Sequence, residues 1–237
     1  MDEKALKTSV GQRIAMIVVA VLLVGATFLT YLFVVMNNGD SASKNSDRND
    51  ALVTQLAEEY DSKSQELAGL MKPVSEKYFS GFKSYLSEVK AYNSASANSD
   101  GLKTKDLKVG TGKTLTDGDT DYGAFYIGWC SDGTIFSSSF DDTEDPTELT
   151  SLLDPSVGLI EGWSEGVIGM KLGGVRQLSI PGELAYGDTE DTLCDGANTP
   201  LRFIIMAIEA DKDMFALQSE MNNLQLQLYY AYYGSMY

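Results

Sequence analysis

The chain has 237 residues, of which 43% are hydrophobic and 22% are charged, which is typical of a folded protein with one domain of ordinary size and additional segments. The formal net charge is −16, and residues 100–211 carry 21 acidic and 7 basic side chains, a net charge of −14. Binding of this region to a phosphate backbone is therefore disfavoured, and no nucleic-acid partner is expected. The chain contains no histidine, which leaves it little acid–base machinery.

An uncharged apolar segment, residues 14–36, lies close to the N-terminus. As a helix it would measure ~34 Å, slightly more than the ~30 Å hydrocarbon core of a bilayer. A signal peptide is the alternative, and SAS at 41–43 resembles a cleavage site, but the apolar core of a signal peptide is usually only about 7–15 residues long. We therefore expect an uncleaved transmembrane helix that contacts the lipid bilayer.

The basic residues near this segment predict its orientation. Lys4, Lys7 and Arg13 precede it, whereas the basic residues that follow it are more distant and lie among acidic ones. The positive-inside rule then places residues 1–13 in the cytoplasm and residues 37–237 outside the cell membrane, which the chain crosses once. A short anchor followed by a domain suggests a bacterial source.

The two cysteines, Cys130 and Cys194, both fall on the predicted outer side. An oxidising compartment would permit a disulfide between them. Two free thiols are the alternative, because the sequence gives no distance between the two residues.

Two polar linkers enclose a predicted helical segment. Residues 37–50 and 93–101 are rich in Asn, Ser and Asp, as linkers often are. Residues 51–92 carry apolar side chains every three or four positions, which predicts amphipathic helix. Pro73 interrupts the pattern and predicts either a kink or the start of a second helix.

Residues 102–211 combine strand-like segments with one short helix. YGAFYIGW, TIFSSSF, VRQLSI and LRFIIMAI have the composition of strands, and turn signals such as DGD and SDG lie between residues 117 and 133. Residues 161–170 (EGWSEGVIGM) place Trp163, Val167 and Met170 on one helical face. We predict an α+β domain in which one helix packs against an antiparallel sheet.

Residues 212–237 form a predicted C-terminal amphipathic helix. Its apolar residues are spaced alternately by three and four positions, as in a heptad seam. This helix could pack on its own domain or on residues 51–92, or it could mediate self-association of the chain.

Four segments of the α+β region carry a family resemblance, in the order LKVGTGKTLTDGDTDYGAFYIGW, DGTIFSSS, GLIEGWSEGVIGMKLGGVRQLSIPGELAYG and TPLRFIIMAIE. In this order and spacing, residues 102–211 resemble the FKBP-type peptidyl-prolyl cis-trans isomerases. The resemblance implies a five-stranded, twisted antiparallel sheet around a short helix, with an apolar pocket between them. It also implies binding of proline-containing polypeptides and an activity that needs neither cofactor nor metal.

The resemblance also implies the site residues, position by position. Tyr126, Phe136 and Tyr186 match the residues that would act on the Xaa-Pro bond. The remaining substrate-binding positions match Leu159, Ile160, Trp163, Phe203 and Ser137.

Three departures from the family pattern affect the rim of this pocket. Ser137 stands where the family usually has an aspartate, and Thr147, beside Pro146, stands where an aromatic is usual. The loop that follows the AYG motif is polar instead of apolar. A non-catalytic module tethered to the membrane, which binds peptides or acts as a chaperone or scaffold, is therefore an alternative to an isomerase. A purely structural envelope protein is a more distant one.

Isomerisation of an Xaa-Pro bond is compatible with a chain that has many aromatic residues and no histidine. Rotation about an Xaa-Pro bond meets a barrier of ~18–20 kcal/mol, because amide resonance is lost as the bond twists. The twisted amide is less polar than the planar one, so an apolar aromatic pocket can favour it, with a hydrogen bond from Tyr186. We expect such an enzyme to assist the folding of exported or envelope proteins, in which slow proline isomerisation limits folding.

Two acidic loops, residues 141–148 and 187–196, flank the predicted pocket. They are interpreted either as solvated surface or as charges that steer basic clients toward the pocket. Residues 141–148 lack the ligand spacing of a known calcium loop, and no metal site is expected.

Overall fold

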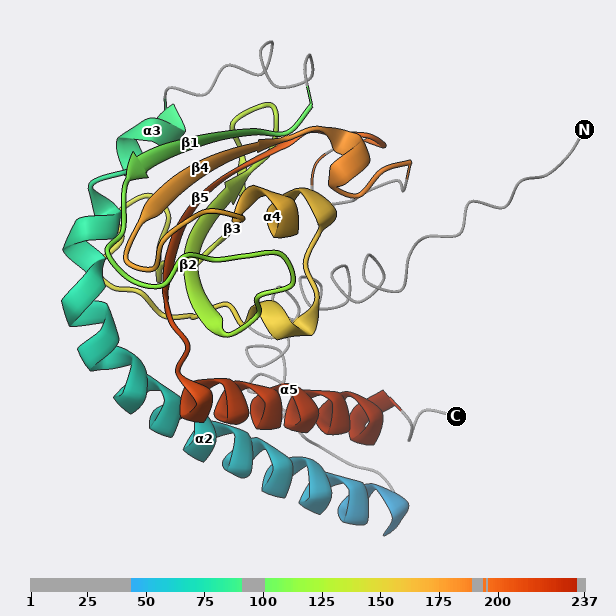
Figure 1. Cartoon of the computed structure of the whole chain (residues 1–237). Coiled ribbons are helices and arrows are strands. Elements are labelled where there is room, and N and C mark those ends of the chain that lie inside the picture. The colour runs from blue at the N-terminus through green and yellow to red at the C-terminus, as the bar shows by residue number, and fades with distance from the viewer. Residues whose placement is uncertain (1–43, 91–100, 189–193, 195, 234–237) are drawn as a thin grey trace, which may run out of the picture. The chain divides into compact units, whose positions relative to one another are not determined.

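A computed structural model of the chain describes residues 44–90, 101–188, 194 and 196–233. Within these residues no helix is long and apolar enough to cross a bilayer, and the predicted transmembrane segment 14–36 lies outside them. The described chain divides into two compact units, residues 73–211 and residues 44–72 with 212–233 (Figure 1). Each unit is described by itself below.

The first unit is built on a five-stranded antiparallel sheet with strand order β1-β4-β5-β2-β3 (Figure 1). The strands are β1 (Lys103–Lys108), β2 (Tyr122–Trp129), β3 (Ile135–Ser138), β4 (Val175–Ile180) and β5 (Leu201–Glu209). β2 and β5 pair along their whole length, from Tyr122 opposite Glu209 to Trp129 opposite Arg202. This arrangement confirms the predicted antiparallel sheet.

The position of each strand in the sheet follows from its composition. β2 and β5 lie in the interior of the sheet and are almost entirely apolar and buried. β1, with the sequence KTKDLK, is a largely exposed edge strand. Lysines on an edge strand discourage pairing with another chain, so the charged composition that hid this strand from the sequence pattern suits its place.

The short helix α4 (Glu161–Gly166) packs against β4, and Figure 1 shows it over the sheet. A Cβ atom on Gly162 would lie 2.3 Å from Cγ2 of Ile180, so the glycine allows the helix to approach the strand closely. The helix is shorter than the predicted 161–170. It ends at Gly166, and turns follow up to Gly169, whose φ of +79° is left-handed.

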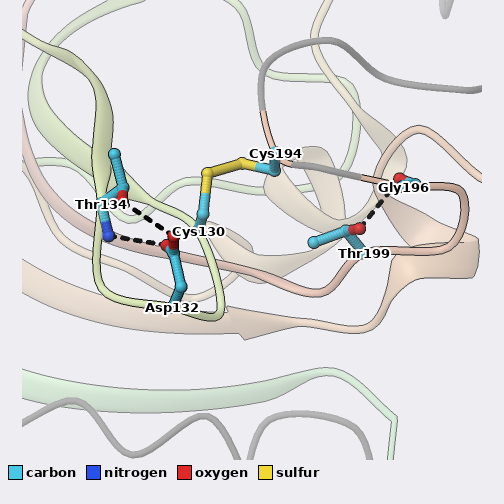
Figure 2. The surroundings of a disulfide bond; sticks show 6 residues. All are labelled: Cys130, Asp132, Thr134, Cys194, Gly196 and Thr199. Carbon is cyan, nitrogen blue, oxygen red and sulfur yellow. Dashed lines mark hydrogen bonds between the residues drawn. A yellow bond between two sulfur atoms is a disulfide. The ribbon is translucent and has the colours of Figure 1, made fainter.

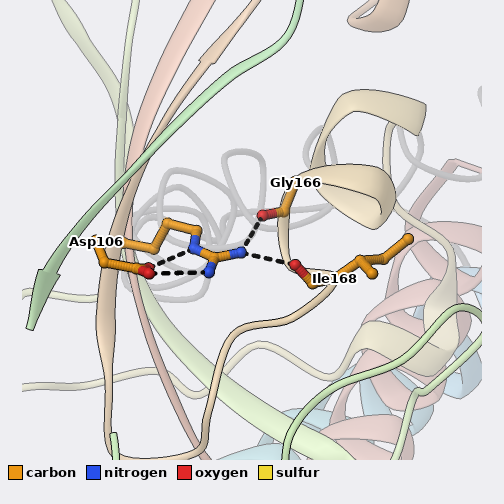
Figure 3. A network of polar contacts seen from close by, with 4 residues as sticks. Asp106, Gly166 and Ile168 are labelled. Carbon is orange, nitrogen blue, oxygen red and sulfur yellow. Dashed lines mark hydrogen bonds and ion pairs between the residues drawn. The ribbon is translucent and has the colours of Figure 1, made fainter. Parts of the chain in front are cut away.

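Arg176 of β4 connects the sheet to the end of α4 (Figure 3). Its guanidinium donates to both carboxylate oxygens of Asp106 at 2.6 and 3.2 Å, and to the carbonyls of Gly166 and Ile168 at 3.0 and 2.8 Å. The side chain is buried, and these bonds satisfy carbonyls that the end of the helix leaves without helical partners.

Helix α2 (Lys44–Lys83) differs from its prediction at both ends. It begins at Lys44, inside the predicted linker 37–50, because no Gly or Pro follows Gly39 until well inside the helix. It runs through Pro73 without starting a second helix. It ends at Lys83, and a turn separates it from the short helix α3 (Leu86–Lys90), so the predicted segment 51–92 is not one continuous helix.

Residues 73–83 of α2, here called the α2 end, belong to the first unit. Tyr78 contacts Phe125 of β2, with ring centroids 6.1 Å apart. Phe82 is fully buried and stacks on Phe140, which follows β3. The α2 end therefore contributes to the hydrophobic packing of the first unit.

The second unit pairs the first part of α2 with α5 (Lys212–Tyr233), the predicted C-terminal helix. Val53 and Leu56 cluster with Leu224 and Leu228. Lys63, further along α2, forms an ion pair with Glu220, which lies earlier on α5, so the two helices are antiparallel. The apolar face of α5 thus packs on the helix predicted at residues 51–92, which is one of the arrangements expected from the sequence.

Candidate functional site

Four aromatic rings pack together on one face of the sheet, and we call them the aromatic cluster: Tyr126, Phe136, Trp163 and Phe203. The Trp163 and Phe203 centroids are 5.1 Å apart, and Phe136 meets Phe203 edge-on at 5.6 Å. Edge-to-face contacts of this kind are favourable because the positive edge of one ring meets the negative face of the other.

Each ring of the aromatic cluster comes from a different element, in the sequence order β2, β3, α4 and β5. Tyr126, Trp163 and Phe203 are buried, whereas Phe136 is only half-buried. Since strands and one helix hold the rings, their positions are fixed by the sheet and do not depend on a loop.

The other predicted site residues lie at the same place. Ile160, the residue before α4, and Tyr186 are buried in the same hydrophobic cluster, and Leu159 is half-buried against it. The structure therefore places every apolar residue that the family resemblance assigned to the site in or against one hydrophobic cluster. Ser137 contacts Tyr126, as described next.

Ser137 forms a hydrogen bond with Tyr126, in which the two hydroxyl oxygens are 2.7 Å apart. Burial raises the pKa of the Tyr126 hydroxyl, and the bond with Ser137 lowers it in part. The phenol therefore stays protonated at neutral pH. At the position where the family resemblance implies an aspartate, the serine therefore supplies a polar partner for Tyr126.

Gly128 is a site residue that the sequence analysis did not identify. A Cβ atom at this position would lie 2.6 Å from Cε1 of Phe203 and 2.8 Å from Cζ of Phe136. The glycine therefore leaves room for the edge-to-face pair. A glycine inside an otherwise apolar strand often marks such a close approach, which is the signal that could have revealed it.

Tyr122 is a second residue that the sequence analysis missed. The indole N–H of Trp163 donates to the Tyr122 hydroxyl at 3.2 Å, and both side chains are almost fully buried. Burial raises the pKa of Tyr122 to about 12. The bond satisfies the one polar atom of the buried indole and fixes the rotation of its ring.

The segment that carries Tyr186 is held by close backbone packing. After η3 (Gly182–Leu184), the Gly187 amide donates to the Gly182 carbonyl at 2.8 Å. A Cβ atom on Gly182 would lie 2.0 Å from the carbonyl oxygen of Asn198, so only glycine fits at this position.

The two cysteines are joined in a disulfide whose Cα atoms are 5.5 Å apart (Figure 2). Cys130 directly follows β2, and Cys194 lies between η3 and β5. Both are buried in the hydrophobic cluster that contains the aromatic cluster. The bond therefore ties the segment before β5 to the strand that carries Tyr126 and Gly128.

Residues 141–148, here called the acidic loop, leave the sheet shortly after β3 and are organised by Asp141. Its carboxylate accepts from the Thr147 amide at 2.9 Å, from the Thr147 hydroxyl at 2.5 Å and from the Glu148 amide at 3.1 Å. These bonds, led by that of the Thr147 hydroxyl, lower the pKa of Asp141 to about 2. Thr147 therefore organises its own loop at the position where the family has an aromatic.

The assembled site is an apolar aromatic surface edged by the hydroxyls of Tyr126 and Ser137. In the described part of the chain, no group of three or more Cys, Asp or Glu side chains is placed to hold a metal ion. Such a surface can bind an apolar ring and lower the polarity around an amide, which is suited to binding proline.

Comparison with known proteins identifies relatives of this chain. The sequence model of a family described as FKBP-type peptidyl-prolyl cis-trans isomerase matches residues 112–207. The chain is 43% identical over 88 residues to the FK506-binding protein of Neisseria meningitidis serogroup B, which covers 37% of this chain and 75% of that protein. It is 40% identical over 87 residues to FK506-binding protein 4 of Gibberella zeae, covering 37% of this chain and 16% of that protein.

Two solved structures are also similar to parts of the chain. The crystal structure of AtFKBP13 has 32% sequence identity and a TM-score of 0.36, covering 48% of this chain and 98% of that one. A peptidyl-prolyl cis-trans isomerase from Pseudomonas syringae pv. tomato has 27% identity and a TM-score of 0.36, covering 56% of this chain and 92% of that one.

Proposed function

Because the chain belongs to the FKBP-type peptidyl-prolyl cis-trans isomerases, we propose that its aromatic cluster is the surface on which the Xaa-Pro bond of a client rotates. The chain is a peptidyl-prolyl cis-trans isomerase, and domains of this family bind proline-containing peptides. The observation that supports the proposed site is the convergence of Tyr126, Phe136, Trp163 and Phe203 from four separate elements.

The proposed mechanism is differential binding of the twisted amide. The proline ring lies on Trp163 at the base of the cluster, between Tyr126 and Phe203, which excludes water from the amide. A planar amide has more charge separation than a twisted one, so removing water disfavours the planar ground state more than the twisted state. The hydroxyl of Tyr186 holds the carbonyl oxygen of the residue before proline in the twisted state.

No step of this mechanism transfers a proton. The Tyr126 hydroxyl, whose pKa is raised by burial, remains a neutral donor or acceptor throughout. Ser137 orients this hydroxyl through the 2.7 Å contact, and half-buried Phe136 borders the site next to Phe203. The chain therefore uses shape and low polarity where other enzymes use acids and bases.

We further propose that the chain is a single-pass protein of the cell membrane. The uncharged segment 14–36, with basic residues on its N-terminal side, supports this location. The isomerase domain would then lie outside the membrane and act on exported proteins as they fold. Self-association through α5 would use its exposed face with Leu226 and Tyr230, because Leu224 and Leu228 pack on α2.

Two measurements on the full chain test this role. Protease added to right-side-out membrane vesicles should digest a tag at the C-terminus and leave a tag at the N-terminus intact. The same chain reconstituted in liposomes should accelerate the slow, proline-limited refolding phase of a client protein. Protection of the C-terminal tag would overturn the proposed location, and an unchanged slow phase would overturn the role in folding.

A further inference from the structure

The residues that flank the acidic loop, Ser139 and Phe140 before it and Leu149 after it, form its base. This base is hydrogen-bonded to Tyr126 of the aromatic cluster. The Tyr126 amide donates to the Ser139 hydroxyl at 3.1 Å, and the Ser139 amide donates to the Tyr126 carbonyl at 2.9 Å. Phe140 and Leu149 then pair across the two ends of the loop. A shift of this base would therefore be transmitted directly to the strand that carries Tyr126.

Three contacts from the α2 end hold the loop and its base. Phe82 stacks on Phe140, with centroids 5.4 Å apart and ring planes 10° apart. The Leu149 amide donates to the Ser75 hydroxyl at 2.9 Å, and Lys83 Nζ donates to the Pro146 carbonyl at 2.8 Å.

The contacts of Ser75 and Phe82 are buried, so losing them would cost free energy of folding. Ser75 is 4% exposed and Phe82 is fully buried. The hydrogen bond between Ser75 and the Leu149 amide is buried as well, so it forms in a site shielded from water, where a hydrogen bond lost to a side-chain change leaves the amide without a partner. Ser75 and Phe82 are seven positions apart on α2, which places them on one helical face.

The α2 end lies outside residues 112–207, which the family model matches. The α2 end therefore contacts the loop bearing Thr147 from outside the segment that the family model matches. The loop organises itself through Asp141, and the α2 end adds contacts to Phe140, Leu149 and Pro146.

We infer that the α2 end is a positioning element of the isomerase site, which sets how the acidic loop meets the client residues next to proline. This inference rests on the proposed function. Ser75, Phe82 and Lys83 are then positioning residues, since none of them belongs to the aromatic cluster.

The test compares Lys83→Met and Ser75→Ala with wild type in the full chain. Each variant removes one hydrogen bond and keeps most of the side-chain volume. A loop that contributes equally to substrate and transition-state binding changes KM and leaves kcat almost unchanged. We expect a roughly 2- to 10-fold increase of KM for Xaa-Pro peptides, with kcat within about twofold of wild type.

Two controls separate positioning from a general loss of stability. Lys72→Met removes an exposed lysine of the same helix and should leave KM unchanged. Lys83→Arg keeps a donor and should restore most of the wild-type KM. Amide exchange of Leu149, followed by NMR, should be faster in Ser75→Ala while the amides of β5 keep their protection.

The outcomes of the two proposals differ. Wild-type activity with unchanged KM in both Lys83→Met and Ser75→Ala would overturn the positioning inference alone. A fall in kcat equal to the fall in kcat/KM would also overturn it, because the contact would then act on the transition state only. A folded wild-type chain without isomerase activity would overturn the proposed function and this inference together.

Discussion

Ser137 supplies the Tyr126 hydroxyl with an uncharged polar partner. The serine hydroxyl lies 2.7 Å from the phenol oxygen, so the phenol is oriented without an ionised neighbour. From the sequence, Ser137 was a reason to consider a non-catalytic module. The structure shows that the position still serves Tyr126.

Gly128 is the residue where the packing of the site can be tested most simply. Gly128→Ala would place a methyl group within 3 Å of the Phe136 and Phe203 rings. We expect a loss of about 1–3 kcal/mol in the free energy of unfolding, because the rings must shift in a close-packed core. We also expect a lower kcat/KM, because the same rings form the proposed substrate surface. Urea unfolding and a peptide assay measure the two effects.

Gly69→Ala is the matched control, because a Cβ atom at Gly69 of α2 would meet nothing within 4 Å. This variant should be neutral or slightly stabilising, since alanine is the better helix former. If Gly128→Ala behaved like Gly69→Ala in both assays, the close approach of Phe136 and Phe203 would be contradicted.

Asp141 predicts how the acidic loop responds to pH. Its pKa is lowered to about 2, so the loop contacts are fully present above about pH 4 and are lost as the pH falls through about 2. NMR titration of the Thr147 and Glu148 amides should give a midpoint near 2. Thr147→Val removes the hydroxyl bond and should raise that midpoint. A wild-type midpoint near the usual aspartate value of 3.8 would contradict the contacts.

Among the elements, those with a strong local pattern were the most predictable. The predicted strand YGAFYIGW coincides with β2, because eight apolar or small residues lie between polar turns. β1 was not recognised from its composition, because KTKDLK has no alternating apolar pattern. It is a strand because it pairs with β4. The family resemblance supplied the fifth strand that periodicity could not.

The ends of the helices were less predictable than their existence. α4 ends at Gly166, although the buried residues Val167 and Met170 continue the helical spacing. The spacing of apolar residues predicts which side chains are buried, but it does not predict where the helical hydrogen bonds end. The packing of the α2 end was also missed. Its apolar residues indicated a buried face, but periodicity does not identify the partner of that face.

The disulfide joins two elements that are 64 residues apart in the sequence. Replacing both cysteines by serine, Cys130→Ser with Cys194→Ser, removes a constraint on the unfolded chain. We expect a loss of about 2–4 kcal/mol in the free energy of unfolding, as is typical for a disulfide. Urea unfolding of the wild-type chain with reductant should approach that of the double variant, which should itself be insensitive to reductant. Equal stability of wild type and double variant without reductant would contradict a stabilising bond.

The net charge of the whole molecule is −16, which should affect how fast it meets charged clients. Negative potential around the site should speed the encounter with basic clients, and salt should screen this effect. We expect kcat/KM to be several-fold higher for Xaa-Pro peptides with flanking lysines than for those with flanking glutamates at about 0.01 M salt, with the two values converging near 1 M. A ratio independent of salt would show that the acidic loops do not steer clients.

The measurement that tests the account most directly is the Xaa-Pro exchange rate of a peptide, followed by NMR with the full chain. We predict clear acceleration by the wild-type chain and loss of most of it in the double variant Phe136→Ala with Tyr186→Phe, while urea unfolding shows the variant to be folded. Acceleration that survives in this folded double variant would contradict the aromatic cluster and Tyr186 as the catalytic site.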